Sequence, residues 1–413
     1  MRQCQPRGIH NDTQDQRQYF QRVEDVVSSY IHSHIVSLAI LALPRSHPSS
    51  LNMAEKKKKV YAEDHFAKLL NREIYWRDNY EWLLESGYRL RPRFSPGWIP
   101  SWKANPKLPF RSCEDSVRQF GGLCDASRTT DGSHVMLKTV DLTRFVNEVA
   151  IMEFVNQEPQ RSDPLNHCMP LLDVLVPPNE PSRRIIAMPI CRMWDSPDFD
   201  TVGEVVDCIK QLIESVQFLH ANRIAHRDIA YGNFMMDTML FTTPFHPFFV
   251  SYRLDYKGSV KAKYTRTQRR PKYYIIDFGL SVRYEPHEMP PMRVMGAYGS
   301  DRTVPEYTSR YEPHNPFPID IYCLGNMIRR EILTANPEQM GFAWIIPLIE
   351  DMMNPDPTRR PTIDEVATRY DEDVSLLTYP LLRSRWIQTW IEALPHFLRK
   401  IRYIQRQTPP IPS

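Results

Sequence analysis

The chain has 413 residues, of which 42% are hydrophobic and 24% are charged. This balance is typical of folded globular proteins and excludes a small disulfide-stapled scaffold and a disordered or fibrous chain. Basic and acidic residues nearly cancel, 52 against 49, so the net charge of +3 gives no reason to expect a nucleic-acid partner.

Seven cysteines are scattered without a C-x-x-C pair, which indicates reduced thiols rather than a disulfide framework or a zinc site. The most apolar run, 35–43, is too short to span a bilayer, so no transmembrane segment is expected. We therefore expect an intracellular protein, cytoplasmic or nuclear. The four lysines of 56–59 fit either a nuclear-import patch or a solvated charge run, and the second interpretation is the commoner one.

The N-terminal part of the chain divides into two expected regions. Residues 1–52 are expected to form a disordered extension, and 53–112 a helical and proline-rich region. Apolar periodicity over 61–86 predicts one or two amphipathic helices before Gly87. Five prolines then fall within 92–109, together with Trp98 and Trp102, which predicts an irregular strap packed on a surface.

The next elements alternate between strands and helices. Strands are expected at 123–127 and 134–140 around an Asp131-Gly132 turn, followed by a helix over 141–155. Two more strands are expected at 170–176 and 185–190, and a long helix over 202–220 ends near Asn222. A strand-rich half before a helical half predicts an α+β fold of two lobes with a cleft between them, the small lobe at 113–190, the large lobe at 191–370 and a helical tail at 371–413.

Five short motifs follow one another in the second half of the chain. They are His226-Arg227-Asp228 with Asn233, Asp277-Phe278-Gly279, Val304-Pro305-Glu306, Asp320 to Gly325, and Asp356 to Pro361. In this order they resemble the motifs of eukaryotic protein kinases. Together with the segment 91–103 and the Asp131-Gly132 turn before Lys138, the pattern is similar to a divergent protein-kinase-like group of mushroom-forming fungi. The resemblance covers roughly residues 80–370 and implies a bilobal protein-kinase-like fold that uses ATP and Mg²⁺.

The resemblance implies roles for residues in both lobes. Asp228 would be the catalytic residue that orients the acceptor hydroxyl, and Asn233 and Asp277 would be the Mg²⁺ ligands, because magnesium prefers hard oxygen ligands. Lys138, in Val135-Met136-Leu137-Lys138, would bind the α- and β-phosphates.

Three further residues complete the implied nucleotide site. Glu148 would pair with Lys138, although Glu153 on the same expected helix is a competitor. Met188 and Cys191 would lie at the hinge that holds adenine.

The sequence departs from the family pattern around the phosphates. It contains no G-x-G, and Gly121-Gly122 is the nearest candidate for a glycine-rich loop, with a plain turn as the alternative. Ala230 and Gly232 stand where protein kinases place a cation near the transferring phosphoryl group, so charge stabilisation in the transition state is in question.

Two other segments carry local basic charge. Asn233 and Asp277 are 44 positions apart, where the family needs about a dozen, and the insert is rich in Lys and Arg. These charges could dock an acidic partner, but solvated loop charges are the commoner arrangement. The tail over 383–407 interleaves six basic residues with apolar ones, which fits either a helix packed back on the large lobe, the interpretation we favour, or a membrane-surface helix.

The leading hypothesis is an ATP-dependent protein kinase acting on Ser or Thr hydroxyls of a protein substrate. The alternative is a pseudokinase, a nucleotide-binding or scaffold module, and a small-molecule phosphotransferase is the weakest of the three.

Arg227 resembles the arginine that holds a phosphorylated activation segment, in which Tyr298, Ser300 and Thr303 lie.

Overall fold

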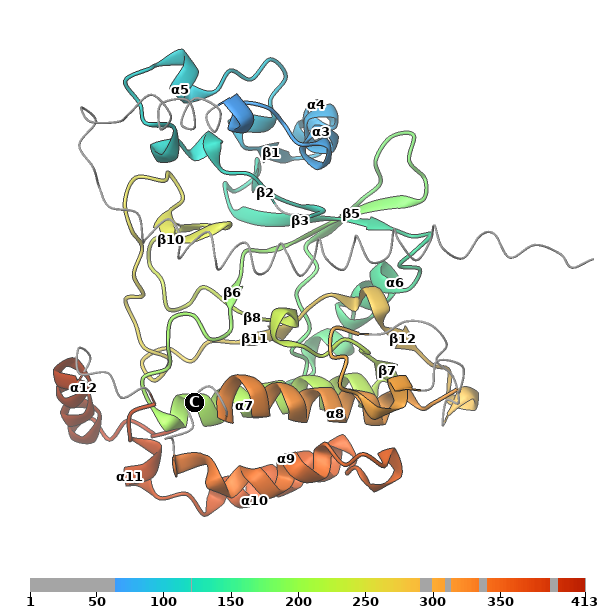
Figure 1. Ribbon diagram of the computed structural model, residues 1–413, viewed down its shortest axis with the longest axis vertical. Coiled ribbons are helices and arrows are strands. Elements are labelled where there is room, and N and C mark those ends of the chain that lie inside the picture. The colour runs from blue at the N-terminus through green and yellow to red at the C-terminus, as the bar shows by residue number, and fades with distance from the viewer. Residues whose placement is uncertain are drawn as a thin grey trace, which may run out of the picture. The chain divides into compact units, whose positions relative to one another are not determined.

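The computed structural model describes residues 64–119, 121–289, 299–308, 313–333, 340–386 and 393–412 (Figure 1). The expected extension 1–52, the lysine run 56–59 and Tyr298 lie outside these ranges. The fold is mixed α/β, and the chain divides between Cys124 and Asp125 into two compact units. The helices are α3 (Asn71–Asp78), α4 (Tyr80–Glu85), α5 (Ser101–Ala104), α6 (Glu148–Val155), α7 (Val202–Ala221), α8 (Pro316–Ile328), α9 (Ile346–Met352), α10 (Ile363–Ser375), α11 (Tyr379–Leu382) and α12 (Ala393–Gln405). The strands are β1 (Tyr88–Leu90), β2 (Leu123–Arg128), β3 (His134–Asp141), β4 (Asp173–Leu175), β5 (Arg183–Pro189), β6 (Arg192–Met193), β7 (Ile224–Ala225), β8 (Phe234–Met236), β9 (Phe245–His246), β10 (Phe249–Arg253), β11 (Tyr273–Ile275) and β12 (Val282–Arg283).

The sheet of the second unit follows the order β2-β3-β5-β4. Strand β2 begins just before the boundary between the units, and the turn that joins it to β3 contains Gly132 at φ 71°, a left-handed conformation that glycine adopts without strain. Strands β3 and β4 both pair antiparallel with β5, and Lys138 lies opposite Ile186. The two strands predicted around the Asp131-Gly132 turn are therefore confirmed.

Helix α6 is shorter than the predicted helix over 141–155, which was wrong at its start. Strand β3 extends to Asp141, whose carboxylate accepts hydrogen bonds from the backbone N–H and the hydroxyl of Thr143 at 2.9 and 2.6 Å. This local turn competes with the first helical turn, so the helix begins at Glu148. Leu142 and Phe145, which gave the apolar stripe its extra length, still pack against the core.

The helical core of the second unit is built around α7, which confirms the predicted helix over 202–220. Thr201 caps it by accepting the backbone N–H of Glu204 at 3.2 Å, and Asn222 follows its last residue. Most of its side chains are buried, so α7 is a core helix rather than a surface one. Figure 1 shows α8 running beside α7, with α9 and α10 forming the next layer.

The basic insert between Asn233 and Asp277 begins and ends at neighbouring positions. Its flanking strands β8 and β11 pair directly, with Met236 opposite Tyr273. The basic side chains inside it have different environments. Lys261 is exposed, as a solvated loop charge would be, whereas Arg266 is only 2% exposed and donates to the hydroxyl of Tyr273 and the carbonyl of Trp194, both at 2.9 Å. Part of the basic charge is therefore structural.

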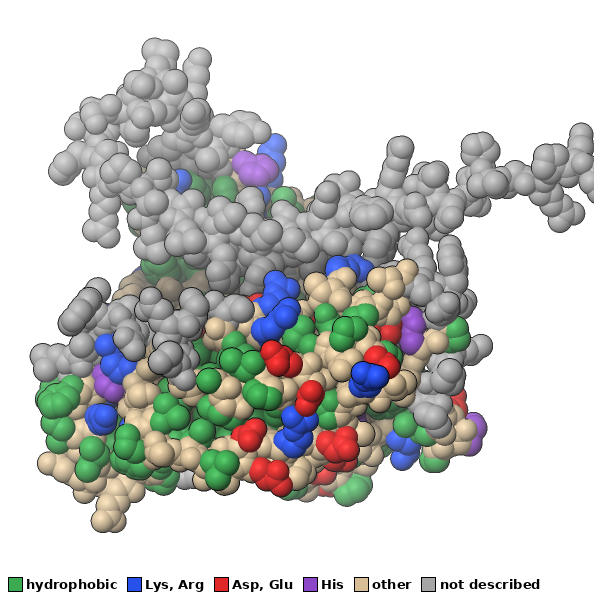
Figure 2. All heavy atoms as spheres, turned by 60° about the horizontal axis from the view of Figure 1, so that its bottom comes forward, with side chains coloured by type: hydrophobic (Ala, Val, Ile, Leu, Met, Phe, Trp, Pro, Cys, Tyr) green, Lys and Arg blue, Asp and Glu red, His purple; other side chains and the backbone are tan. Residues whose placement is uncertain are grey.

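The C-terminal helix α12 packs on the second unit through polar side chains. Asp200, just before α7, accepts hydrogen bonds from Arg399 and His396, and the hydroxyl of Tyr403 lies 2.8 Å from that of Thr265. Figure 2 shows green and blue side chains together at the left end of the described surface, the end at which Figure 1 places α12. No helix in the described part of the chain combines the length and the apolar character needed to cross a bilayer.

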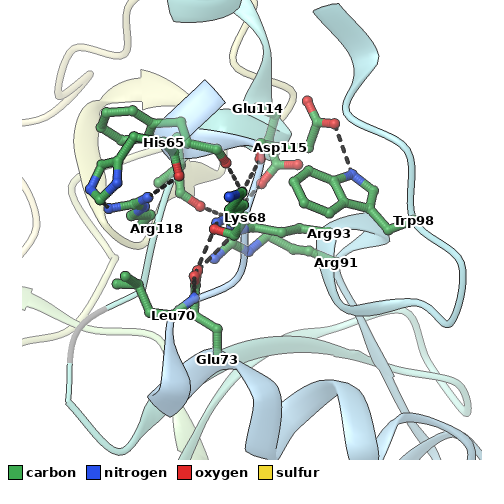
Figure 3. A network of polar contacts seen from close by, with 12 residues as sticks. His65, Lys68, Leu70, Glu73, Arg91, Arg93, Trp98, Glu114, Asp115 and Arg118 are labelled. Carbon is green, nitrogen blue, oxygen red and sulfur yellow. Dashed lines mark hydrogen bonds and ion pairs between the residues drawn. The ribbon is translucent and has the colours of Figure 1, made fainter. Parts of the chain in front are cut away.

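The first unit is organised around a buried ion pair (Figure 3). Arg93 donates to both carboxylate oxygens of Glu73, at 2.8 and 3.0 Å, and both residues are fully buried. Glu73 also accepts the backbone N–H of Leu70 at the start of α3. A buried charge of this kind is tolerated only when it is paired and hydrogen-bonded, so this pair fixes the proline-rich strap to α3.

A second carboxylate, that of Asp115, also holds the strap. Asp115 accepts hydrogen bonds from the indole N–H of Trp98 at 3.0 Å and from the backbone N–H of Ser101 at 2.8 Å. Ser101 begins the short helix α5, and the Trp102 ring within it is 5% exposed. The strap therefore packs on the unit as predicted, but it contains short helical turns where no regular structure was expected.

Candidate active site

Two small antiparallel strand pairs bring together the loop that carries Asp228 and the loop that carries Asp277. Strand β7, directly before His226, pairs with β12, which follows Gly279. Strand β8, directly after Asn233, pairs with β11, which precedes Asp277. The loop carrying Asp228 and the loop carrying Asp277 are therefore held side by side by backbone hydrogen bonds, including one from the N–H of Ile276 to the carbonyl of Asn233 at 3.0 Å.

Lys138 joins the sheet to this pair of loops. Its Nζ donates to Glu148 Oε1 at 2.5 Å and to Asp277 Oδ1 at 3.0 Å. Burial alone would lower the pKa of Lys138, but the carboxylates of Asp277 and Glu148 outweigh it and raise the pKa well above its ordinary value. Lys138 is therefore a fixed cation between two anions from different segments.

Glu148 is the carboxylate on α6 that reaches Lys138, while Glu153 is exposed. Five residues along a helix correspond to a rotation of about 140°, so the two side chains cannot face the same neighbour. Burial raises the pKa of Glu148, which is 1% exposed, and Lys138 opposes this effect. Its second oxygen, Oε2, is buried and accepts no hydrogen bond within the described residues.

Asp228 is held by two neighbours. Its Oδ2 accepts from the side-chain amide of Asn233 at 3.0 Å, and its Oδ1 accepts from the backbone N–H of Ser300 at 2.5 Å. Burial raises the pKa of Asp228, the hydrogen bond from Ser300 lowers it, and the nearby charge of Asp277 raises it further. The sequence carried no signal for the contact with Ser300, because a backbone group makes it.

Asp277, whose charge acts on Asp228, adopts a strained backbone conformation. Its φ of 65° lies in the left-handed region, which non-glycine residues rarely adopt. Lys138 lowers the pKa of Asp277, although burial opposes it, so the carboxylate is held in its ionised form. The ring of His226 lies against Phe278, with centroids 5.5 Å apart, and its Nε2 is 3.0 Å from the carbonyl of Ile276.

Asp320 at the start of α8 positions the loop that contains Asp228. Fully buried, it accepts the backbone N–H groups of His226 and Arg227, both at 2.7 Å, and lies 3.2 Å from His220 Nε2. Arg227 has a φ of 67°, so these bonds hold a strained backbone in place. The resemblance to kinases predicted that Asp320 lies at the start of a buried helix, but not that it accepts these backbone N–H groups. A carboxylate within an apolar run is the sequence feature that could have indicated such a buried acceptor.

The motifs around Glu306 and Asp356 meet through a buried ion pair. Arg360 donates from Nη1 and Nη2 to the two carboxylate oxygens of Glu306, both at 2.8 Å, and from Nε to the carbonyl of Asn354. Neither charged group is more than slightly exposed. This fork-to-fork pair ties two segments that are 54 residues apart in sequence.

The two residues expected at the hinge lie along and after β5. Met188 is opposite Met136 and therefore shares a face of the sheet with Lys138. Cys191 follows the end of β5, and its sulfur lies 4.0 Å from that of Met169. Burial raises the pKa of the Cys191 thiol to about 12, so it is an uncharged packing group.

The departures from the kinase pattern occupy defined positions. Gly121, at φ 56°, precedes β2 in the first unit. Ala230 has an extended backbone, and Gly232 is exposed. Thr303, which lies in the segment expected to be the activation segment, donates a hydrogen bond from its hydroxyl to the carboxylate of Asp301 at 2.7 Å.

The oxygens around Asp228 that could hold a divalent cation are few, so phosphates and water would have to supply the other ligands. The described residues contain no group of three or more His, Cys, Asp or Glu side chains that could hold a metal. Asn233 uses its amide N–H on Asp228, which leaves its Oδ1 for a cation, and the contacts of Asp277 use Oδ1, which leaves Oδ2. Magnesium accepts such a sparse set of hard oxygens when phosphates and water complete it.

Comparison with known proteins does not assign this site. No model of a protein family matches the chain, and none of the curated proteins matches it significantly.

Proposed function

We propose that this chain is an ATP- and magnesium-dependent protein kinase that transfers the γ-phosphate to a protein hydroxyl, Ser or Thr by preference. In this proposal the β2–β5 sheet with α6 and the region built on α7 are the two lobes of a kinase-like fold. The observation that carries it is one cluster: Lys138 bridges Glu148 and Asp277, next to the hydrogen-bonded Asp228 and Asn233.

Each residue has a role that its surroundings support. Lys138, kept protonated by two carboxylates, would bind the phosphates of the nucleotide, and Glu148 would hold its ammonium group in position. Asp228, oriented by Asn233, would accept the proton of the substrate hydroxyl. Asn233 and Asp277 would hold Mg²⁺, which supplies neutralisation of phosphate charge when it is bound.

A nucleotide-binding module without turnover is the second candidate. Ala230 provides no cation beside Asp228, and the Ser300 N–H already donates a hydrogen bond to one of the two carboxylate oxygens of Asp228. These observations favour a pseudokinase, because phosphoryl transfer depends on electrostatic stabilisation and on positioning of the acceptor.

Transfer of labelled γ-phosphate to generic peptides and to the chain itself separates the two candidates. We expect transfer by the wild type and none by Asp228→Asn. Asp351→Asn, which changes a surface carboxylate paired with Arg369, should retain full activity. Wild-type transfer no greater than that of Asp228→Asn would refute the enzyme proposal.

Nucleotide binding is tested separately by a thermal shift with Mg-ATP. Ligand at 100 times its Kd stabilises the folded state by about 2.7 kcal/mol, so the shift is measurable. We expect Asp277→Asn to reduce the shift strongly. An unchanged shift in that variant would show that the metal assignment is wrong, and a normal shift without any transfer would favour the pseudokinase.

A further inference from the structure

Helix α12 presents an apolar face to solvent. Its exposed apolar residues, with their exposed fractions, are Phe397 (58%), Leu398 (47%), Ile401 (37%) and Ile404 (52%). The opposite side of the helix packs on the protein through His396, Arg399 and Tyr403. This is the reverse of an ordinary surface helix, which buries its apolar side and exposes its polar side.

The positions around the helix axis define the exposed face. At about 100° per residue, with Tyr403 at zero, the four apolar side chains cover an arc of roughly 120° on the far side. Lys400 and Arg402 lie about 40° beyond its two edges. The helix contains no Asp or Glu. Gln405, the last residue of the helix, is exposed and also lies within this arc. A largely apolar arc bordered on both sides by cations is therefore turned outward.

We propose that α12 docks this chain on the surface of an anionic lipid membrane. Apolar side chains enter the boundary between headgroups and acyl chains, while Lys and Arg at the edges extend their charges to the headgroups. The cations give the charge complementarity that selects anionic lipids. The long stems of Lys400 and Arg402 allow both contacts at once.

The contacts that attach α12 to the second unit are compatible with binding to a membrane. Asp200 holds Arg399 through two hydrogen bonds, at 2.8 and 2.9 Å, and holds His396 at 3.0 Å. These contacts use only the polar side of the helix, so the apolar side can enter a membrane surface while the helix stays attached. The helix has 13 residues and would lie along the surface rather than cross the bilayer.

The test is co-sedimentation of the full chain with vesicles of phosphatidylcholine alone and of phosphatidylcholine mixed with phosphatidylserine. We expect binding to the mixed vesicles that weakens as salt is added, and much weaker binding to the neutral ones. The double variant Lys400→Gln/Arg402→Gln should bind about twenty-five-fold more weakly, about fivefold for each cation. Ile401→Ser/Ile404→Ser should lose at least about tenfold by removing inserted apolar surface.

A matched control removes exposed side chains of the same kinds elsewhere. Leu376 is 80% exposed after α10, and the side chain of Arg359 is 75% exposed, so Leu376→Ser/Arg359→Gln should bind like the wild type. All variants change surface residues and should keep the wild-type melting temperature.

Three results would overturn the proposal. They are absence of binding to the mixed vesicles, equal binding to neutral vesicles, and a concentration-dependent dimer that Ile401→Ser/Ile404→Ser abolishes. The last would show that a second copy of the chain covers the apolar arc.

Discussion

Replacing Asp200 by Asn should destabilise the second unit in a way that depends on pH. The Asp200 side chain is 11% exposed and receives hydrogen bonds from Arg399 and His396. Burial alone would raise its pKa, but these two partners lower it from 3.8 to about 2. A carboxylate with a depressed pKa stabilises the folded state above its unfolded pKa, and this contribution is lost as the pH falls through the folded one.

The magnitude follows from the two pKa values. The difference between 3.8 and about 2, at about 1.36 kcal/mol per pKa unit, corresponds to about 2.4 kcal/mol at neutral pH. We therefore expect Asp200→Asn to lower the free energy of unfolding by about 2 kcal/mol at pH 7. As the pH falls from 4 to 2 and below, the difference from the wild type should shrink toward zero, because Asp200 then becomes protonated in the folded wild type as well.

Urea denaturation of both proteins, followed at several pH values, measures this difference. Asp351→Asn is the matched control, because Asp351 pairs with Arg369 at 2.8 Å but is 54% exposed, and surface pairs contribute less than about 1 kcal/mol. The reasoning fails if Asp200→Asn costs no more than the control at pH 7. It also fails if the loss is as large at pH 2 as at pH 7, since the effect would then not depend on charge.

Three further predictions concern the second unit. Gly203→Ala places a Cβ against the carbonyl oxygen of Pro410 with no room for it, so the segment around Pro410 should be displaced and cleaved faster in limited proteolysis; unchanged cleavage would contradict this. Arg266→Gln removes buried hydrogen bonds and should cost about 3 kcal/mol in thermal unfolding, whereas the exposed Lys261→Gln should change stability by less than about 0.5 kcal/mol; equal effects would show that Arg266 is not structural. If the proposed activity is present, kcat/KM should fall on acidification at a pH above the ordinary pKa of an aspartate, because burial raises the pKa of Asp228; an acid limb at or below that pKa would argue against Asp228 as the base.

Local sequence patterns predicted the elements whose hydrogen bonds close within a short segment. The long periodic run gave α7 almost to the residue, and the Asp131-Gly132 turn gave the hairpin of β2 and β3. The same reasoning failed at the start of α6, where the Asp141 side chain competes for the backbone, and in the strap, where prolines start short helical turns.

What the sequence by itself determined was the set of candidate site residues and most of the elements on which they lie. Only the tertiary structure decided which of them meet. Glu148 rather than Glu153 faces Lys138, and the backbone N–H of Ser300 donates a hydrogen bond to the carboxylate of Asp228. It also decided that Arg266 is buried while α12 turns its apolar side outward. The physical reason is that periodicity fixes how side chains are spaced around an element, whereas the direction each face takes depends on partners far away in the chain.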